Sequence, residues 1–486
     1  MTTGNPPAPP QEEKVDLPLK VKIGYCIYPL FSSMGSIMAI AFLTFFVTDV
    51  VGLNPVTMAT IYTIARFADL GVQVFAPSII NNLTRVRPLL FIIPIISQAG
   101  TIVSFLNPPL PYMAKLVLLT VAYCCIHFPM NFSTVVINTI MMKVCRGNMA
   151  NLLWIPTTST RISAVWRIFS PFLQMPLILF FIKAGLPGYF IVACIFAAMT
   201  MIAHATLYII SAPYEESKEE AAAALAARKA AAQTAPKGPS ILQQYAMAAK
   251  NVPAMAMLIG GIVTGITGQV MSGGLQYYWR YSIGDLAMQA TAGSISGILA
   301  VPLSIVGPII GRKLGMRKTL IFNQLWTAMC YILYYLFSNG NPWGYIIIAC
   351  IGSISMYPAM IYMALPWLDA AEVQLAKTGV DVRPFIMGLN NYSIKIGFIC
   401  QGPILAWMLT ATGYVKDVEI ANLPLFMLIW MGIPFIGQLI YFLCFFFFYK
   451  ITPEEAQEAR TANQRATEER MAAAREAAGE EPVKAS

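Results

Sequence analysis

The sequence predicts an all-α membrane protein with twelve transmembrane helices in two six-helix bundles. Its 486 residues are 57% hydrophobic and only 11% charged, whereas a soluble chain of this length needs a larger polar surface. Its apolar runs, such as residues 423–449, exceed the roughly 20 residues that cross a bilayer. A charged segment at residues 214–240 divides these runs six and six, and this division predicts two bundles.

The twelve predicted spans follow one another through the chain. Their expected bounds are 23–48, 56–80, 88–106, 112–142, 162–182, 188–211, 252–279, 286–311, 319–338, 343–368, 384–411 and 422–449. The first of them is longer than the apolar core of a signal peptide, and the residues before it are polar and proline-rich. We therefore expect no cleaved leader.

The spans and the charged segments between them predict the domain organisation. The expected domains are a cytoplasmic N-terminal tail at 1–22, an N-terminal six-helix bundle at 23–211, a cytoplasmic central loop at 212–251, a C-terminal six-helix bundle at 252–449 and a cytoplasmic C-terminal tail at 450–486. The central loop and the C-terminal tail are rich in alanine and charged residues, which is typical of solvated helical connectors.

Lysine and arginine residues are distributed unevenly between the two sides of the predicted bilayer. Most of the 32 lie in the tails and the even-numbered loops, whereas the opposite loops hold Lys115, Lys183, Arg280 and Lys416. By the positive-inside rule we expect both termini in the cytoplasm and the chain in the cell (inner or plasma) membrane. The net charge of +9 is then a topology signal, and no nucleic-acid partner is expected.

Catalytic and metal-binding patterns do not occur in the sequence. The nine cysteines show no CxxC spacing, His127 and His204 lie on separate apolar spans without an HExxH motif, and there is no Walker motif. We therefore expect no enzyme activity, no metal and no cofactor. Two bundles around a long central loop favour a transporter with alternating access over a channel. A non-transporting sensor would need a further signalling domain, which we expect neither tail to hold.

Ionisable residues inside the predicted spans are the first candidates for function, because charge at membrane depth is costly. They are Arg66, Asp69, Arg167 and Lys395. Arg66 and Asp69 lie three residues apart on one helix face, and Gln73 follows one turn after Asp69. Two interpretations are open: a structural ion pair, or an Asp69 that faces a central cavity and binds a coupling cation or proton.

Lys395 lies in a polar part of the eleventh span, beside Asn391 and Tyr392. A lysine in mid-span needs an acidic partner, and Asp69 is the one acid clearly inside a span, so we predict an Asp69–Lys395 pair between the bundles. Arg167 follows Trp166 in the fifth span. An arginine beside an aromatic ring suits a ligand with a ring and an anionic group, and it suits membrane anchoring equally well.

Several short motifs occur in a set order along the chain. In the first half they are KIGY (22–25), FVTDVVGL (46–53), IARFAD (64–69) and LTRVRP (83–88), and in the second half ALPWLDAAEVQLAKTG (364–379) and NNYSIKIGFICQGPILAWMLTATGY (390–414). In this order and spacing they resemble the glycoside–pentoside–hexuronide:cation symporters, the melibiose-permease group of the major facilitator superfamily. The resemblance covers both halves, and it implies the major facilitator fold and sugar transport by cation symport.

The resemblance also implies roles for particular residues. Asp69 is implied to be the first acid of the family's cation site and Lys395 its neighbouring lysine, whereas Gln73 replaces the second aspartate of sodium-coupled members. The sugar-binding acid of the first span falls on Ser33, and that of the fourth span falls near Met142. The cytoplasmic gate candidates are Arg85, Arg87, Asp369 and Glu372. The candidate residues of the substrate cavity are Ser33, Arg66, His127, Arg167, Asn391 and Tyr392.

The charges inside the spans bear on the coupling ion and the substrate. One carboxylate beside a neutral glutamine is a poor sodium site, since a hard cation needs several oxygen ligands, so we expect H+ rather than Na+ as the coupling ion. An excess of basic residues inside the spans favours an anionic substrate. The sequence thus predicts a monomeric symporter of a small glycoside, hexuronide or related organic anion, with the lipid bilayer and this substrate as its partners. The alternative is an uncoupled facilitator or exporter of a non-sugar compound on the same fold.

Overall fold

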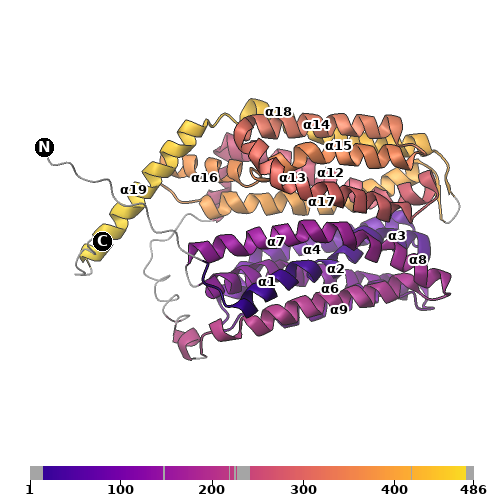
Figure 1. The fold of residues 1–486 in the computed structure, drawn as a ribbon, viewed down its shortest axis with the longest axis horizontal. Helices are drawn as coiled ribbons and strands as arrows, with labels where there is room; N and C mark the ends of the chain where they lie inside the picture. Colours follow the sequence, from indigo (N-terminus) through magenta and orange to yellow (C-terminus); the bar gives the residue numbers. More distant parts are fainter. Residues whose placement is uncertain are drawn as a thin grey trace. The chain divides into compact units, whose positions relative to one another are not determined.

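The computed structural model describes residues 15–145, 148–217, 219–223, 226, 241–416 and 419–477. Within these residues the regular structure is helical except for one antiparallel hairpin, β1 (Tyr414–Val415) and β2 (Glu419–Ile420). Figure 1 shows the long helices, coloured along the sequence. The predicted all-α fold class is confirmed.

The helices of the first half of the chain include two short π-helical segments. In order they are α1 (Leu19–Phe31), α2 (Met34–Ile37), η1 (Met38–Phe42), α3 (Leu43–Phe45), η2 (Phe46–Val51), α4 (Pro55–Asn81), α5 (Leu89–Ser104), α6 (Tyr112–Cys145), α7 (Met149–Phe169), η3 (Ser170–Leu173), α8 (Met175–Lys183), α9 (Gly188–Ile210) and η4 (Ala212–Tyr214). The run from α1 to η2 forms one continuous apolar stretch of 33 residues.

The helices of the second half end in a polar helix beyond the last predicted span. In order they are α11 (Ile241–Lys250), α12 (Val252–Tyr277), η5 (Tyr278–Ile283), α13 (Met288–Leu314), α14 (Met316–Phe337), α15 (Pro342–Met360), α16 (Leu365–Thr378), α17 (Arg383–Ala411), α18 (Leu423–Phe448) and α19 (Pro453–Ala477).

Every predicted span overlaps a helix or a run of consecutive helices. Among the described residues, nine helices or helix runs are long and apolar enough to cross a membrane, and Leu89–Ser104 and Ser170–Lys183 are shorter apolar helices. Helix α4, which carries Arg66 and Asp69, is long enough for a span at 27 residues. The chain is therefore a multi-pass integral membrane protein.

The predicted start of the fifth span, at residue 162, is wrong. The structure has α7 from Met149, then the 3₁₀ turn η3, then α8. Asn148 caps α7, because its side-chain oxygen accepts a hydrogen bond from the Asn151 backbone N–H at 2.9 Å. Polar residues at 157–161 lower the local hydropathy and conceal the helix. Pro171, which lacks a backbone N–H, lies in the turn η3 that follows α7.

The chain forms two compact units. Among the described residues, unit 1 falls within Met1–Leu53, Phe67–Thr234 and Leu286–Val301, and unit 2 falls within Asn54–Arg66, Ala235–Asp285 and Pro302–Ser486. Helices α4 and α13 therefore each begin in one unit and end in the other. The predicted bundle bounds, 23–211 and 252–449, stay a prediction.

The two halves share a local backbone pattern just before α4 and α13. The segments η2 and η5 are both π-helical, and each ends at a glycine in the left-handed region, Gly52 with φ 82° and Gly284 with φ 79°. In both, the next backbone N–H reaches back six residues: Leu53 N bonds Val47 O at 3.0 Å, and Asp285 N bonds Trp279 O at 3.1 Å. Such a repeat is typical of transporters built from two related halves.

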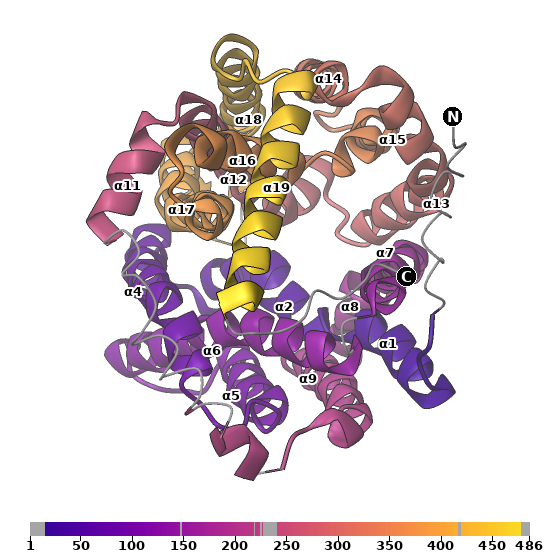
Figure 2. The ribbon, with the colours of Figure 1, turned by 90° about the vertical axis from the view of Figure 1, so that its left-hand side faces the viewer.

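In unit 2, α12 packs against both α17 and α18, which lie beside it in the end-on view of Figure 2. Helices α12 and α17 approach closely because small residues line their contact. A Cβ on Gly397 would lie 2.4 Å from the backbone carbon of Gly265, and a Cβ on Gly261 would lie 2.7 Å from Ser393 Oγ. Small residues at such crossings let membrane helices pack backbone to backbone.

In unit 1, α5 packs against α6 and α9, and α1 packs against α7 and α9. The contact of α5 with α6 is again made at a glycine, since a Cβ on Gly100 would lie 2.7 Å from the Ala122 carbonyl oxygen. This packing holds α6, which carries His127 and Asn131, in a defined position within the unit.

Candidate functional site

The centre of the candidate site is Asp69 on α4, which is fully buried at 0% exposure. Helix α4 begins at Pro55, and the Asn54 side-chain oxygen accepts a hydrogen bond from the Val56 backbone N–H at 2.8 Å. On α6, Asn131 Nδ2 donates to Asp69 Oδ1 at 2.6 Å. A buried carboxylate needs such a donor, because leaving it without one is costly.

Asn131 was not among the residues predicted for the site. It follows Pro129 inside the long apolar helix α6, and its Nδ2 also lies 3.4 Å from the Asp69 backbone oxygen and 3.3 Å from the Phe128 backbone oxygen. The signal that could have identified it is an amide in a lipid-spanning run, which it shares with Asn138, since polar groups at membrane depth are rarely idle. The sequence does not say which helix such a residue faces.

Gln73 lies one turn after Asp69 on α4. Its Oε1 is buried, and no hydrogen-bond donor among the described residues reaches it. Buried amide oxygens normally have a partner, so this acceptor stands out beside a buried carboxylate. The face of α4 in unit 1 thus carries one carboxylate and one amide oxygen a turn apart.

Arg66 is 5% exposed and belongs to unit 2. Its guanidinium carbon lies 4.3 Å from the centroid of the Phe398 ring on α17, which is a cation–π contact. Because α4 passes from unit 2 to unit 1 between Arg66 and Phe67, the two charges on this helix are positioned by different units. The choice between a structural ion pair and a coupling site stays open.

The remaining candidates on α17 lie in unit 2. Lys395 is half-buried, Tyr392 is half-buried against the apolar core of the unit, and Asn391 is exposed. Lys395 lies two residues before Gly397, at the close crossing of α17 with α12. The Asp69–Lys395 pair stays a prediction, since the two residues belong to different units.

The remaining cavity candidates of unit 1 lie on three helical segments. His127 is half-buried and meets Tyr123 edge to face at 4.4 Å between ring centroids, and it lies one turn before Asn131 on α6. Ser33 is exposed at the start of α2. The backbone of Arg167 lies in α7, and its side chain lies outside the described residues.

The gate candidates of unit 1 are paired within that unit. Arg87 Nη1 lies 2.9 Å from Glu215 Oε2, its Nε donates to the Tyr208 carbonyl at 2.9 Å, and its guanidinium stacks over the Tyr208 ring. Arg85 Nε lies 3.6 Å from Glu215 Oε1. The sequence reasoning missed Glu215, which closes the turn η4 after the sixth span.

The gate candidates of unit 2 lie on α16. Asp369 pairs with Arg460 of α19 and accepts a hydrogen bond from Tyr449 Oη at 3.1 Å. Glu372 pairs with Arg383 Nη1 at 3.1 Å. Asn463 Nδ2 also donates to Glu372 Oε2, at 2.6 Å.

Helices α16 and α19 thus form a polar contact in unit 2, and it continues into the α16–α17 loop. There Arg383 donates two hydrogen bonds from its side chain to Asp381, at 3.0 and 2.8 Å. These hydrogen bonds lower the pKa of the Asp381 carboxyl.

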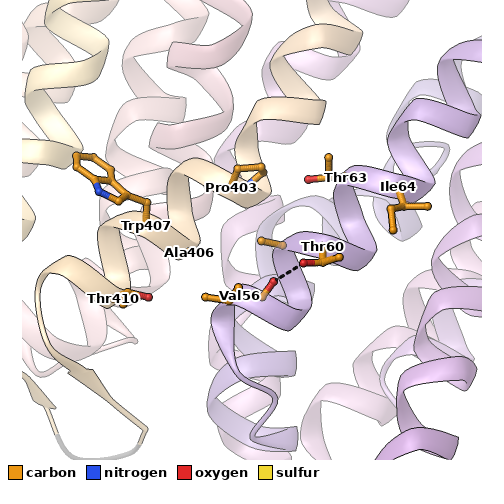
Figure 3. Close-up of a pocket in the computed structure, with 9 residues that line it drawn as sticks. Val56, Thr60, Thr63, Ile64, Pro403, Ala406, Trp407 and Thr410 are labelled. Carbon is orange, nitrogen blue, oxygen red and sulfur yellow. Dashed lines mark hydrogen bonds between the residues drawn. The ribbon is translucent and has the colours of Figure 1, made fainter.

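A pocket of about 540 Å³ lies between α4 and α17 in unit 2 (Figure 3). Its lining residues are Val56, Ala59, Thr60, Thr63, Ile64, Pro403, Ala406, Trp407 and Thr410. Trp407 and Ile64 are 57% and 65% exposed, and Thr60 Oγ1 already donates to the Val56 carbonyl at 2.9 Å. An open, largely apolar lining suits contact with lipid better than recognition of a polar solute.

No group of three or more histidine, cysteine, aspartate or glutamate residues that could hold a metal ion occurs in the described part of the chain. Asp69 and Asn131 place a carboxylate and an amide in contact, Gln73 adds an amide one turn along α4, and His127 adds an imidazole one turn before Asn131 on α6. Such a set can accept and release a proton or bind polar groups of a small solute.

Comparison with known proteins places the chain among transporters. Residues 26–470 match the model of a family described as MFS/sugar transport protein. An Escherichia coli K12 protein assigned as a 2,3-dihydroxypropane-1-sulfonate exporter is 23% identical over 429 residues, which are 84% of this chain and 86% of the relative. The isoprimeverose transporter of Lactiplantibacillus pentosus is 20% identical over 418 residues, 82% of each chain.

A third relative matches over half its length. A Salmonella typhimurium LT2 protein assigned as a sulfoquinovose importer is 23% identical over 249 residues, 46% of this chain and 50% of the relative. Among solved structures, the nucleoside transporter NupG matches with a TM-score of 0.61 at 13% identity over 90% of this chain and 100% of its own. A D-xylose–proton symporter matches with a TM-score of 0.56 at 11% identity over 90% and 96%. These structures share the major facilitator fold.

Proposed function

Because the chain belongs to the MFS/sugar transport protein family, we propose that it is a proton-coupled symporter that moves a small polyhydroxylated organic anion by alternating access. Its relatives and structural neighbours are transporters, and the chain is likewise a membrane transporter and not an enzyme. The proposal adds the coupling ion, the charge of the substrate and the residues that act.

The observation that carries the proposal is the buried carboxylate of Asp69. It lies in a membrane-spanning helix at 0% exposure and accepts a 2.6 Å hydrogen bond from Asn131. A carboxylate is expensive to keep at membrane depth and usually serves transport there. One carboxylate can take up a proton with a single oxygen, whereas a hard metal cation needs several oxygen ligands. Asp69 therefore suits coupling to protons.

The charge of the substrate is inferred from two independent features. Arg66, Arg167 and Lys395 are three basic residues within the predicted spans. The buried acids of the helices in the first half of the chain are Asp69 and Asp49, the latter at the end of the apolar run Leu19–Val51. An excess of positive charge at such depth attracts an anion. In addition, two of the relatives are assigned to sulfonated compounds, 2,3-dihydroxypropane-1-sulfonate and sulfoquinovose. A sulfonate or carboxylate on a polyhydroxylated carbon skeleton meets both requirements.

Transport in proteoliposomes tests the coupling ion and the substrate together. When the outside is more acidic than the inside and sodium is absent, we expect accumulation of an organic sulfonate or a hexuronate. The inside-to-outside concentration ratio should reach about tenfold per pH unit for one proton per substrate. A neutral disaccharide should compete poorly. Sodium-dependent uptake of a neutral sugar, without competition by organic anions, would overturn the proposal.

Asp69→Asn tests the role of the carboxylate. The variant should lose accumulation driven by a pH gradient and keep exchange of labelled for unlabelled substrate, because exchange needs no net proton movement. Asp69→Glu, which keeps the acid, should retain part of the accumulation. A wild-type protein and an Asp69→Asn variant that accumulate substrate equally would contradict proton coupling through this residue.

A second function is an uncoupled facilitator or exporter on the same fold. The E. coli relative assigned as an exporter favours it. In that case downhill efflux should be fast, uphill uptake should not occur, and Asp69→Asn should change the efflux rate little. The same two measurements, uphill uptake and downhill efflux, therefore separate the two functions.

We also expect a monomer in the cell membrane with both termini in the cytoplasm. The asymmetric distribution of lysine and arginine supports this orientation. Labelling of single cysteines placed in the C-terminal tail, from inside and outside the cell, measures the orientation directly.

A further inference from the structure

We propose that Asn131 is a positioning residue that makes the Asp69 site reject sodium ions and so reserves it for protons. The inference rests on the proposed function, in which Asp69 is the coupling acid. It concerns a contact between α4 and α6 that lies entirely within unit 1.

The orientation of the Asn131 amide follows from its surroundings. Three oxygen acceptors surround Nδ2: Asp69 Oδ1 at 2.6 Å, the Phe128 carbonyl at 3.3 Å and the Asp69 carbonyl at 3.4 Å. Exchanging the amide oxygen for the nitrogen would place an acceptor against all three. The amide therefore presents its N–H groups, and not its oxygen, to the carboxylate.

This orientation affects metal ions and protons differently. A hard cation needs several oxygen lone pairs directed at one point, and an N–H donor on Oδ1 occupies a lone pair and brings partial positive charge to that point. A proton needs one lone pair only, and a carboxylate that accepts one hydrogen bond keeps further lone pairs on its two oxygens. Asn131 thus blocks a cation that must be surrounded, and it leaves room for a proton.

Gln73 on α4 is the candidate for one further oxygen ligand. Its Oε1 is buried, one turn from Asp69, with no hydrogen-bond donor among the described residues. If position 131 carried an acceptor instead of a donor, the site would offer two carboxylates and an amide oxygen. Asn131→Asp should therefore convert the site into one that binds sodium.

Thermal unfolding of the purified full-length protein tests this without any substrate. Each variant is heated in sodium chloride and in choline chloride at equal ionic strength. The wild type should unfold at the same temperature in both salts. Asn131→Asp should show a saturable rise of about 5–11 °C with sodium at a hundredfold excess over the Kd.

Three control variants assign the effect to the site. Asn131→Leu removes the donor, adds no oxygen ligand and keeps the number of side-chain heavy atoms, so it should respond to sodium less than Asn131→Asp does. Adding Asp69→Asn to Asn131→Asp should abolish the response. Adding Gln73→Leu to Asn131→Asp should weaken sodium binding by about tenfold, the loss expected for one oxygen ligand.

Two results would overturn the inference: a wild type stabilised by sodium over choline, or a folded Asn131→Asp variant that unfolds identically in both salts. The proposed function fails by a different measurement, in which the wild type and Asp69→Asn accumulate substrate equally.

If Asn131→Asp does not yield folded protein, Gln73→Asp replaces it. Sodium should then bind at least about tenfold more tightly to the Gln73→Asp, Asn131→Leu double variant than to Gln73→Asp alone, because the donor is gone. Equal affinities would refute the role of Asn131.

Discussion

The crossing of α12 and α17 makes a prediction that can be worked out from the structure. A Cβ on Gly397 would lie 2.4 Å from the Gly265 carbonyl carbon, 2.6 Å from its oxygen and 2.8 Å from its Cα. All three atoms are backbone, so no side chain can turn away. Ordinary contact of a Cβ begins at 3.4 Å. In Gly397→Ala the helices must therefore separate by about 1 Å at this point, as overpacked contacts do.

The size of the effect follows from two opposing terms. Overpacking of a well-packed contact costs roughly 1–3 kcal/mol. Alanine is favoured over glycine within a helix by about 1 kcal/mol, which offsets part of the cost. We expect a net loss of about 0–2 kcal/mol in the free energy of unfolding, toward the upper end because all three contacts are to backbone atoms, and a fall in Tm of about 2–4 °C per kcal/mol for a unit of this size.

Gly388→Ala is the matched control, because it lies on the same helix and its Cβ would meet no atom within 4 Å. Thermal unfolding in detergent should show Gly397→Ala below the wild type and Gly388→Ala equal to it or higher. In Gly397→Ala the transport rate per folded protein should also fall, since Lys395 lies two residues away on the same helix. If both variants unfold at the same temperature, the close packing at this crossing is not what stabilises unit 2.

Two further predictions concern charged groups of unit 2. Arg460→Ala removes the ion-pair partner of Asp369, which is 3% exposed. Breaking a buried pair lowers the free energy of unfolding by roughly 3–5 kcal/mol, and we expect the lower end because Arg460 is partly exposed. Lys377→Ala breaks the exposed pair with Glu455 and should lower the free energy of unfolding by only about 0–1 kcal/mol, measured by thermal unfolding in detergent. Equal losses in the two variants would contradict a stabilising role for the buried Arg460–Asp369 pair. Phe398→Leu should remove the cation–π contact that holds Arg66, at a cost of about 0.5–2 kcal/mol, and slow transport, whereas Phe398→Tyr keeps an aromatic ring and should not. Identical transport rates for the two variants would show that this contact does not affect transport.

Sequence patterns predicted the fold class and the approximate position of every span, because a lipid-spanning helix must be apolar along its whole length. The same rule explains the error at the fifth span. The first half of α7 carries polar residues at 157–161, so hydropathy alone placed its start too late. The rule also identified Asp69 and Arg66, since a charge within an apolar run is visible without any structure.

By itself, the sequence determined the helices, their order and which positions carry charge at membrane depth. Only the tertiary structure decided which helix each charge meets. Asn131 and Asp69 are separated by 62 residues, and Arg460 and Asp369 by 91. Helical periodicity assigns a residue to a face of its own helix, but the neighbour of that face depends on packing between helices, such as the glycine contact of Gly397 with Gly265. The donor on Asp69, and the selectivity proposed for it, could therefore be seen only once α4 and α6 were packed together.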